Sequence, residues 1–85
     1  MKSFTYTIID ELGIHARPAG QIVSEAKKFS STIMIDAGEK KAGATKLMAV
    51  MALGVKCGQS VTVTAEGEDE EAAIACMQEF FEANL

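Results

Sequence analysis

The sequence predicts a single α+β domain in which an antiparallel sheet is covered on one side by helices. Several short segments alternate apolar and polar residues, which is typical of strands with one buried and one exposed face. Other segments repeat apolar residues at helical spacing. With 85 residues, 48% of them apolar, and no linker or repeat, residues 1–85 are expected to form one domain in the order β-α-β-β-α-β-α.

Four segments carry the strand pattern. Residues 4–8 alternate large apolar side chains with threonines, and residues 31–36 place two isoleucines on one face. A tight turn at 37–39 leads to a short third strand at 40–44. The clearest alternation lies at 59–66. Because each segment also has a polar face, we expect antiparallel pairing with one face of the sheet left open.

The first helix is predicted to begin at Arg17 and to run for about a dozen residues. Its apolar stripe consists of Ala19, Ile22, Val23, Ala26 and Phe29. Pro18 is compatible with this helix because it falls in the first turn, where its missing N–H group has no partner to lose.

Two further helices follow. A short one is predicted at 47–53, and Gly54 suits the left-handed position just after its end. Asp69 is expected to cap the last helix, with Glu70 and Glu71 complementing its positive end. The apolar stripe of that helix consists of Ala73, Ile74, Met77, Phe80 and Phe81.

Composition excludes several classes of function. A net charge of −4 disfavours binding to nucleic acid or to an anionic membrane. No apolar run approaches the length of a membrane span, and the N-terminus lacks the apolar core of a signal peptide. Cys57 and Cys76 are too few for a zinc site and are expected to be free thiols, so we expect no metal or cofactor and a cytoplasmic protein.

His15 is the only histidine, and it stands where the first loop turns into the first helix. A helix N-terminus offers unpaired N–H groups and a positive dipole end, which together bind anions. Arg17 adds a fixed positive charge that can hold phosphate oxygens. Neutral imidazole is a nucleophile near neutral pH, so this arrangement suits a transient phosphohistidine. No second base or metal cluster accompanies it, which argues against a hydrolase.

Three segments, in order along the chain, resemble signatures of the HPr family, the histidine-containing phosphocarriers of the bacterial phosphoenolpyruvate-dependent sugar phosphotransferase system. Residues 13–19, Gly-Ile-His-Ala-Arg-Pro-Ala, are similar to the active-site signature of that family. Residues 47–54 resemble its second-helix signature, and residues 65–70 resemble its junction between the last strand and the last helix. The length of the chain matches as well.

The resemblance implies an open-faced β-sandwich of four antiparallel strands with three helices on one face. It also implies a carrier, not an enzyme, that accepts a phosphoryl group from enzyme I and passes it to IIA domains of sugar permeases. The phosphoryl group would rest on Nδ1 of His15, with assistance from Arg17. The backbone N–H groups of Ala16 and Arg17 would help to hold it.

The same resemblance implies a partner-binding apolar patch on the second helix, at Leu47, Met48 and Met51. Methionines at helical spacing are more often core residues. Here, however, the helix is too short to bury all of its apolar side chains against one sheet, so an adaptable docking surface is expected.

The sequence departs from the family at one regulatory position. Many members have a serine at the start of the second helix, which a dedicated kinase phosphorylates, whereas this chain has Lys46. An ammonium group can neither cap the helix nor become phosphoserine. Thr45, one residue earlier, has the only nearby hydroxyl that could substitute.

Two alternative hypotheses for the function of the chain remain. One is a regulatory or specialised-pathway relative with the same fold, such as a nitrogen-pathway carrier; purely regulatory relatives lack the active histidine. The other is a ligand-binding domain of ferredoxin-like type, which the three matched segments disfavour. We expect a monomer whose partners are enzyme I, the IIA domains and regulatory proteins.

Overall fold

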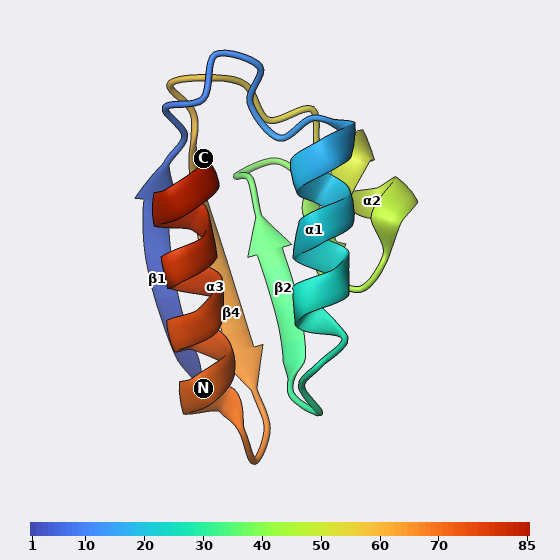
Figure 1. Cartoon of the computed structure of the whole chain (residues 1–85), viewed down its shortest axis with the longest axis vertical. Coiled ribbons are helices and arrows are strands. Elements are labelled where there is room, and N and C mark those ends of the chain that lie inside the picture. Colours follow the sequence, from blue (N-terminus) through green and yellow to red (C-terminus); the bar gives the residue numbers. More distant parts are fainter.

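Four antiparallel strands form one sheet, and three helices lie against one of its faces (Figure 1). The computed structural model describes residues 1–85. The strands are β1 (Lys2–Thr7), β2 (Thr32–Asp36), β3 (Lys41–Gly43) and β4 (Ser60–Glu66). The helices are α1 (Ala16–Ala26), α2 (Leu47–Ala52) and α3 (Glu70–Asn84). The predicted fold class and element order are therefore confirmed.

The strands lie in the order β1-β4-β2-β3, so the last strand in the sequence occupies the centre of the sheet. All three pairings are antiparallel. In their registers Tyr6 pairs with Val61, and Ile35 pairs with both Val63 and Ala42. These apolar residues therefore share the face of the sheet that the helices cover.

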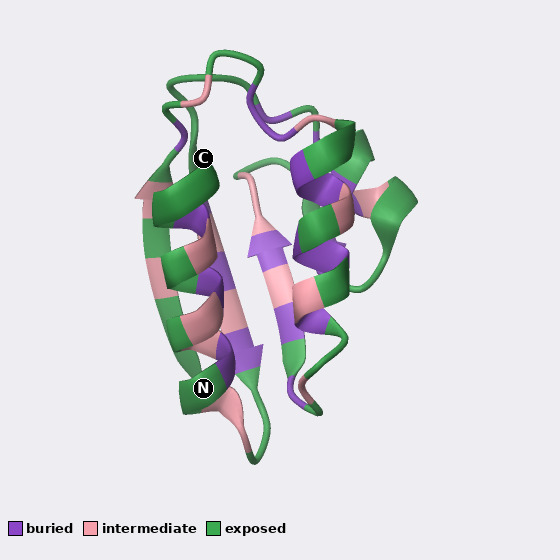
Figure 2. Cartoon of the chain, in the orientation of Figure 1, coloured by how far each residue is buried: buried purple, intermediate pink, exposed green.

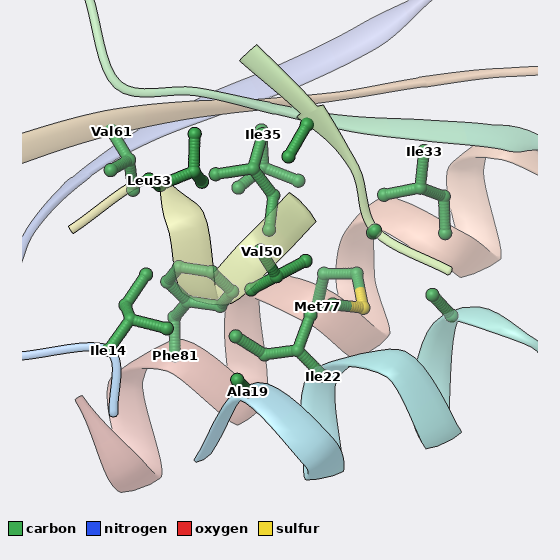
Figure 3. Close-up of a cluster of buried hydrophobic side chains, with 14 of the residues drawn as sticks. Ile14, Ala19, Ile22, Ile33, Ile35, Val50, Leu53, Val61, Met77 and Phe81 are labelled. Carbon is green, nitrogen blue, oxygen red and sulfur yellow. The ribbon is translucent and has the colours of Figure 1, made fainter. Parts of the chain in front are cut away.

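The core fills the space between the covered face of the sheet and the helices (Figure 3). Its largest fully buried side chains are Phe81, Ile8, Ile22, Ile35, Met77, Val50, Val61 and Val63. Phe81 of α3 makes edge-to-face contacts with Phe4 and Tyr6 of β1, at ring-centroid separations of 5.6 and 5.9 Å. These contacts fix the end of α3 against the first strand.

The other face of the sheet carries short polar side chains. Thr5 and Thr62 share a hydrogen bond of 3.2 Å, and Thr7 and Ser60 share one of 2.9 Å. The sides of the helices that point away from the sheet are also largely exposed (Figure 2). The alternation seen in the sequence thus separates the two faces as predicted.

The ends of the helices differ in detail from the prediction. α1 ends at Ala26, three residues before Phe29, which is half-buried and still packs against the core. α2 ends at Ala52, one residue before its predicted end, and Gly54 lies in the left-handed region at φ +62°, as predicted.

The predicted capping role of Asp69 is wrong. Asp69 does occupy the N-cap position of α3, but its side chain makes no cap hydrogen bond. Its carboxylate instead accepts from the N–H groups of Ser30 and Ser31, both at 2.9 Å, and from the Ser31 hydroxyl. Ser31 is buried, so its polar groups need a partner that water does not supply. Asp69 therefore connects the start of α3 to the loop before β2.

Candidate functional site

His15 is the N-cap residue of α1. Its backbone is extended, with φ −97° and ψ −173°, and its side chain makes no cap hydrogen bond, so both imidazole nitrogens are free. The N–H groups of Ala16 and Arg17 also lack acceptors, because the residues that would accept from them precede the helix. The helical ladder begins with the N–H of Ala19, which donates to the His15 carbonyl at 2.9 Å. An unused imidazole therefore lies beside two unused backbone donors.

The loop of residues 8–14 that leads to His15 is held at both ends. The N–H groups of Ile9 and Asp10 donate to the Leu85 carbonyl at 2.6 and 2.9 Å, just past the end of α3. The N–H of Ile14 donates to the Val55 carbonyl at 3.1 Å. These contacts tie the loop to two segments far away in the sequence, and they fix the start of α1 before any partner binds.

Gly13 permits the close approach of this loop to residues 55 and 56. Its φ of +66° lies in the left-handed region. A Cβ atom on Gly13 would overlap the Val55 carbonyl oxygen and would lie 2.7 Å from the Cα atom of Lys56. Glycine is therefore required here both for backbone conformation and for space.

A polar hollow of about 220 Å³ opens at His15. It is lined by Asp10, His15, Arg17, Pro18, Gln21 and Asn84. Arg17 is exposed and has no salt-bridge partner, so its guanidinium is available to an anion. Asp10 is already engaged, since its Oδ1 accepts from the Leu12 N–H at 2.9 Å.

Asp10, Gln21 and Asn84 also line this hollow, although no sequence motif pointed to them. Asp10 has a local signal, because an Asp that begins a turn before glycine commonly accepts from the backbone two residues on. Asn84 lies at the end of α3, and only tertiary packing brings it to the hollow that His15 also lines.

α2 exposes the apolar side chains singled out in the sequence. Val50 and Leu53 are buried, whereas Leu47, Met48 and Met51 are exposed, Met48 by 78%. α2 packs against α1, which starts beside His15. The helix is thus unable to bury its whole apolar surface, as expected.

Lys46 is the N-cap residue of α2 and makes no side-chain cap hydrogen bond. Thr45 is exposed one residue before it. The position where the family resemblance predicts a serine therefore stands at a helix start but has no hydroxyl group.

Elsewhere the chain offers no competing centre. A larger hollow of about 500 Å³ lies between the β2–β3 turn and Leu53, but it contains no imidazole or thiol. Cys57 and Cys76 are free thiols, and no three His, Cys, Asp or Glu side chains gather as a metal site would need. Burial and the hydrogen bond to Glu25 raise the pKa of the Cys76 thiol, which disfavours its thiolate. None of the helices is both long and apolar enough to cross a membrane.

Comparison with known proteins places this fold in a family of phosphoryl carriers. The family described as "PTS HPr component phosphorylation site" matches residues 2–83. The chain is 44% identical to the phosphocarrier protein HPr of Lysinibacillus sphaericus, over 91% of this chain and 88% of that protein. It is 42% identical to the HPr of Mycoplasma capricolum, over 93% of this chain and 89% of that protein.

A solved structure of HPr from Thermoanaerobacter tengcongensis superimposes with a TM-score of 0.92 and 43% identity, covering 98% of this chain and 93% of that one. The chain therefore belongs to the HPr family, the phosphocarriers of the sugar phosphotransferase system. Both curated relatives are phosphocarriers, which disfavours the regulatory or specialised-pathway alternative. The protein is a phosphoryl carrier and not an enzyme.

Proposed function

We propose that His15 accepts the phosphoryl group on Nδ1 from phosphorylated enzyme I and passes it to IIA domains of sugar permeases. The observation that carries this proposal is the position of the only histidine, at the N-cap of α1 with both imidazole nitrogens free. Beside it lie the unpaired N–H groups of Ala16 and Arg17 and the guanidinium of Arg17.

In the transfer step the Nδ1 lone pair of neutral His15 attacks phosphorus while the bond from phosphorus to the donor breaks. The phosphoryl oxygens keep their negative charge throughout. The two backbone N–H groups and the Arg17 guanidinium point donors at those oxygens, and they stabilise the charge at the helix N-terminus. Transfer to a IIA domain reverses the step with a new nucleophile, so the carrier returns unchanged.

Leu47, Met48 and Met51, which we call the α2 patch, form the proposed docking surface for several partners. Methionine side chains adapt to differently shaped surfaces, and the patch is exposed on a helix that packs against α1. We further propose that the protein acts as a cytoplasmic monomer. Regulation by a serine kinase is absent, because Lys46 occupies the regulatory position.

The test is to incubate the protein with phosphoenolpyruvate and purified enzyme I and to measure its intact mass. We expect one added phosphoryl group, which is lost in acid and kept in alkali, as a phosphoramidate is. The variant His15→Ala should gain none. Arg17→Ala, which keeps the imidazole, is the matched control and should still be phosphorylated, but slowly. A phosphoryl group that persists on His15→Ala would contradict the proposal.

A further inference from the structure

We propose that Ile9 and Leu12 form an apolar contact surface for enzyme I, the protein that phosphorylates His15. This inference rests on the function proposed above and adds a second docking element, separate from the α2 patch.

The exposure of these two side chains is unusual within their own loop. Ile8 and Ile14 of the same loop are buried, whereas Ile9 is 72% and Leu12 is 70% exposed. Single exposed apolar side chains are ordinary on protein surfaces. In this chain, however, every exposed large apolar side chain other than Met1 belongs either to this pair or to the α2 patch. Exposed large apolar side chains are therefore confined, apart from Met1, to this loop and to α2.

The position of the pair places it beside the phosphoryl-accepting site. Asp10 stands between Ile9 and Leu12 in the loop and lines the same hollow as His15. Leu12 is three residues before His15, so their Cα atoms are within about 10 Å. A phosphoryl group passes between two proteins only when both side chains reach the same phosphorus atom. A partner docked on His15 thus comes within reach of this pair.

The rigidity of the loop favours one constant partner over many. Hydrogen bonds to Leu85 and Val55 hold the loop in place, and the Leu12 N–H is bound to the Asp10 carboxylate. The β-branched Ile9 side chain also has few rotamers. A rigid surface loses little entropy on binding but accommodates few shapes, unlike the methionines of the α2 patch. Enzyme I is the one partner needed in every cycle, whereas the IIA domains differ with the sugar.

The side chains of the loop indicate what kind of surface on enzyme I would bind it. Asp10 and Glu11 lie between the two apolar residues, and Glu11 is exposed. We therefore expect an apolar depression on enzyme I, near its phosphoryl-bearing side chain, with a basic residue at its edge.

The test is the steady-state phosphorylation of the double variant Ile9→Gln/Leu12→Gln by enzyme I and phosphoenolpyruvate. We expect KM for the carrier to rise about 10- to 100-fold with kcat unchanged, since uniform binding energy is lost. The control Ile9→Val/Leu12→Ile keeps the apolar surface and should change KM by less than about threefold. Because both side chains are exposed, the double variant should keep its Tm.

The outcomes separate this inference from the proposed function. If the unaltered protein is phosphorylated on His15 but the double variant keeps the same KM, only this inference is overturned. If the unaltered protein is not phosphorylated, the proposed function is overturned and this inference with it. Equal slowing of transfer from phosphorylated carrier to a IIA domain would overturn the assignment to enzyme I. If the double variant does not fold, Leu12→Gln alone provides the same comparison.

Discussion

Replacing Gly13 with alanine should both destabilise the protein and displace His15. An alanine at φ +66° costs about 1–2 kcal/mol through its left-handed conformation alone. The new Cβ atom also overlaps the Val55 carbonyl oxygen, so the loop must move away from residues 55 and 56. That movement breaks the hydrogen bond from the Ile14 N–H to Val55, between two buried residues, at a further cost of about 1–3 kcal/mol.

Gly54→Ala is a matched control for this prediction. Gly54 has nearly the same φ, +62°, but a Cβ atom there would meet nothing within 4 Å. The Gly54→Ala variant is therefore destabilised only by the left-handed conformation of the new alanine. For a domain of this size 1 kcal/mol corresponds to about 4–8 °C in Tm, so Gly13→Ala should melt at least about 5 °C below Gly54→Ala.

Thermal unfolding followed by circular dichroism measures the stability difference, and phosphorylation by enzyme I measures the effect on the site. We expect Gly13→Ala to be phosphorylated more slowly than Gly54→Ala at a temperature where both are folded. Equal melting temperatures for the two variants would refute the argument, because they would show that the loop does not depend on its close approach to residues 55 and 56.

The remaining predictions concern the charges at the site, the α2 patch and the junction before β2. Arg17→Ala should slow phosphoryl transfer about 10- to 100-fold, the loss expected for one charge-assisted hydrogen bond, while Tm stays the same. Rapid-quench kinetics measure the transfer rate and a melting curve measures Tm. An unchanged transfer rate or a lowered Tm would contradict this role of Arg17. Met48→Glu should weaken binding to enzyme I and to IIA domains, as measured by calorimetry, without unfolding; an unfolded variant would identify Met48 as a core residue. An HPr kinase with ATP should leave the protein unmodified because Lys46 has no hydroxyl, and a phosphate mapped to Thr45 by mass spectrometry would contradict this. Hydrogen bonds from Ser31 and Ser30 lower the pKa of Asp69 below its ordinary value of 3.8. Its stabilising effect is therefore fully present above that value and is lost as the pH falls through the lower folded-state pKa. Urea midpoints of the parent and Asp69→Asn should accordingly converge in acid, and a constant gap down to pH 2 would argue against this linkage.

Local patterns were enough to identify every helix and strand, because most of them have one apolar and one polar face and the short apolar helix α2 ends at a glycine. The strand order was not predictable in the same way. β4 lies between β1 and β2, and β1 and β4 are joined only by pairings such as Phe4 with Val63. No short window of sequence contains both partners of such a pair. The local spacing of apolar residues therefore does not predict which strands pair.

The same distinction applies to the site. His15 and Arg17 were recognisable because they are neighbours in sequence and share one helix end. Asn84 and Leu85 reach the site from the end of α3, and only tertiary packing reveals them. Asp69 was placed correctly at a helix start, but its carboxylate serves Ser31 instead of its own helix, because a buried serine is the more demanding partner.

The central position of β4 has a consequence for the protein during its synthesis. β1 and β2 leave the ribosome first, but neither pairs with the other, and both wait for β4 to lie between them. The loop before His15 is fixed later still, because the Leu85 carbonyl that accepts hydrogen bonds from the N–H groups of Ile9 and Asp10 lies beyond α3. A nascent chain therefore holds its only histidine on a loop that lacks this support until Leu85 has been made. The loop that leads to His15 is therefore among the last parts of the fold to reach its final position.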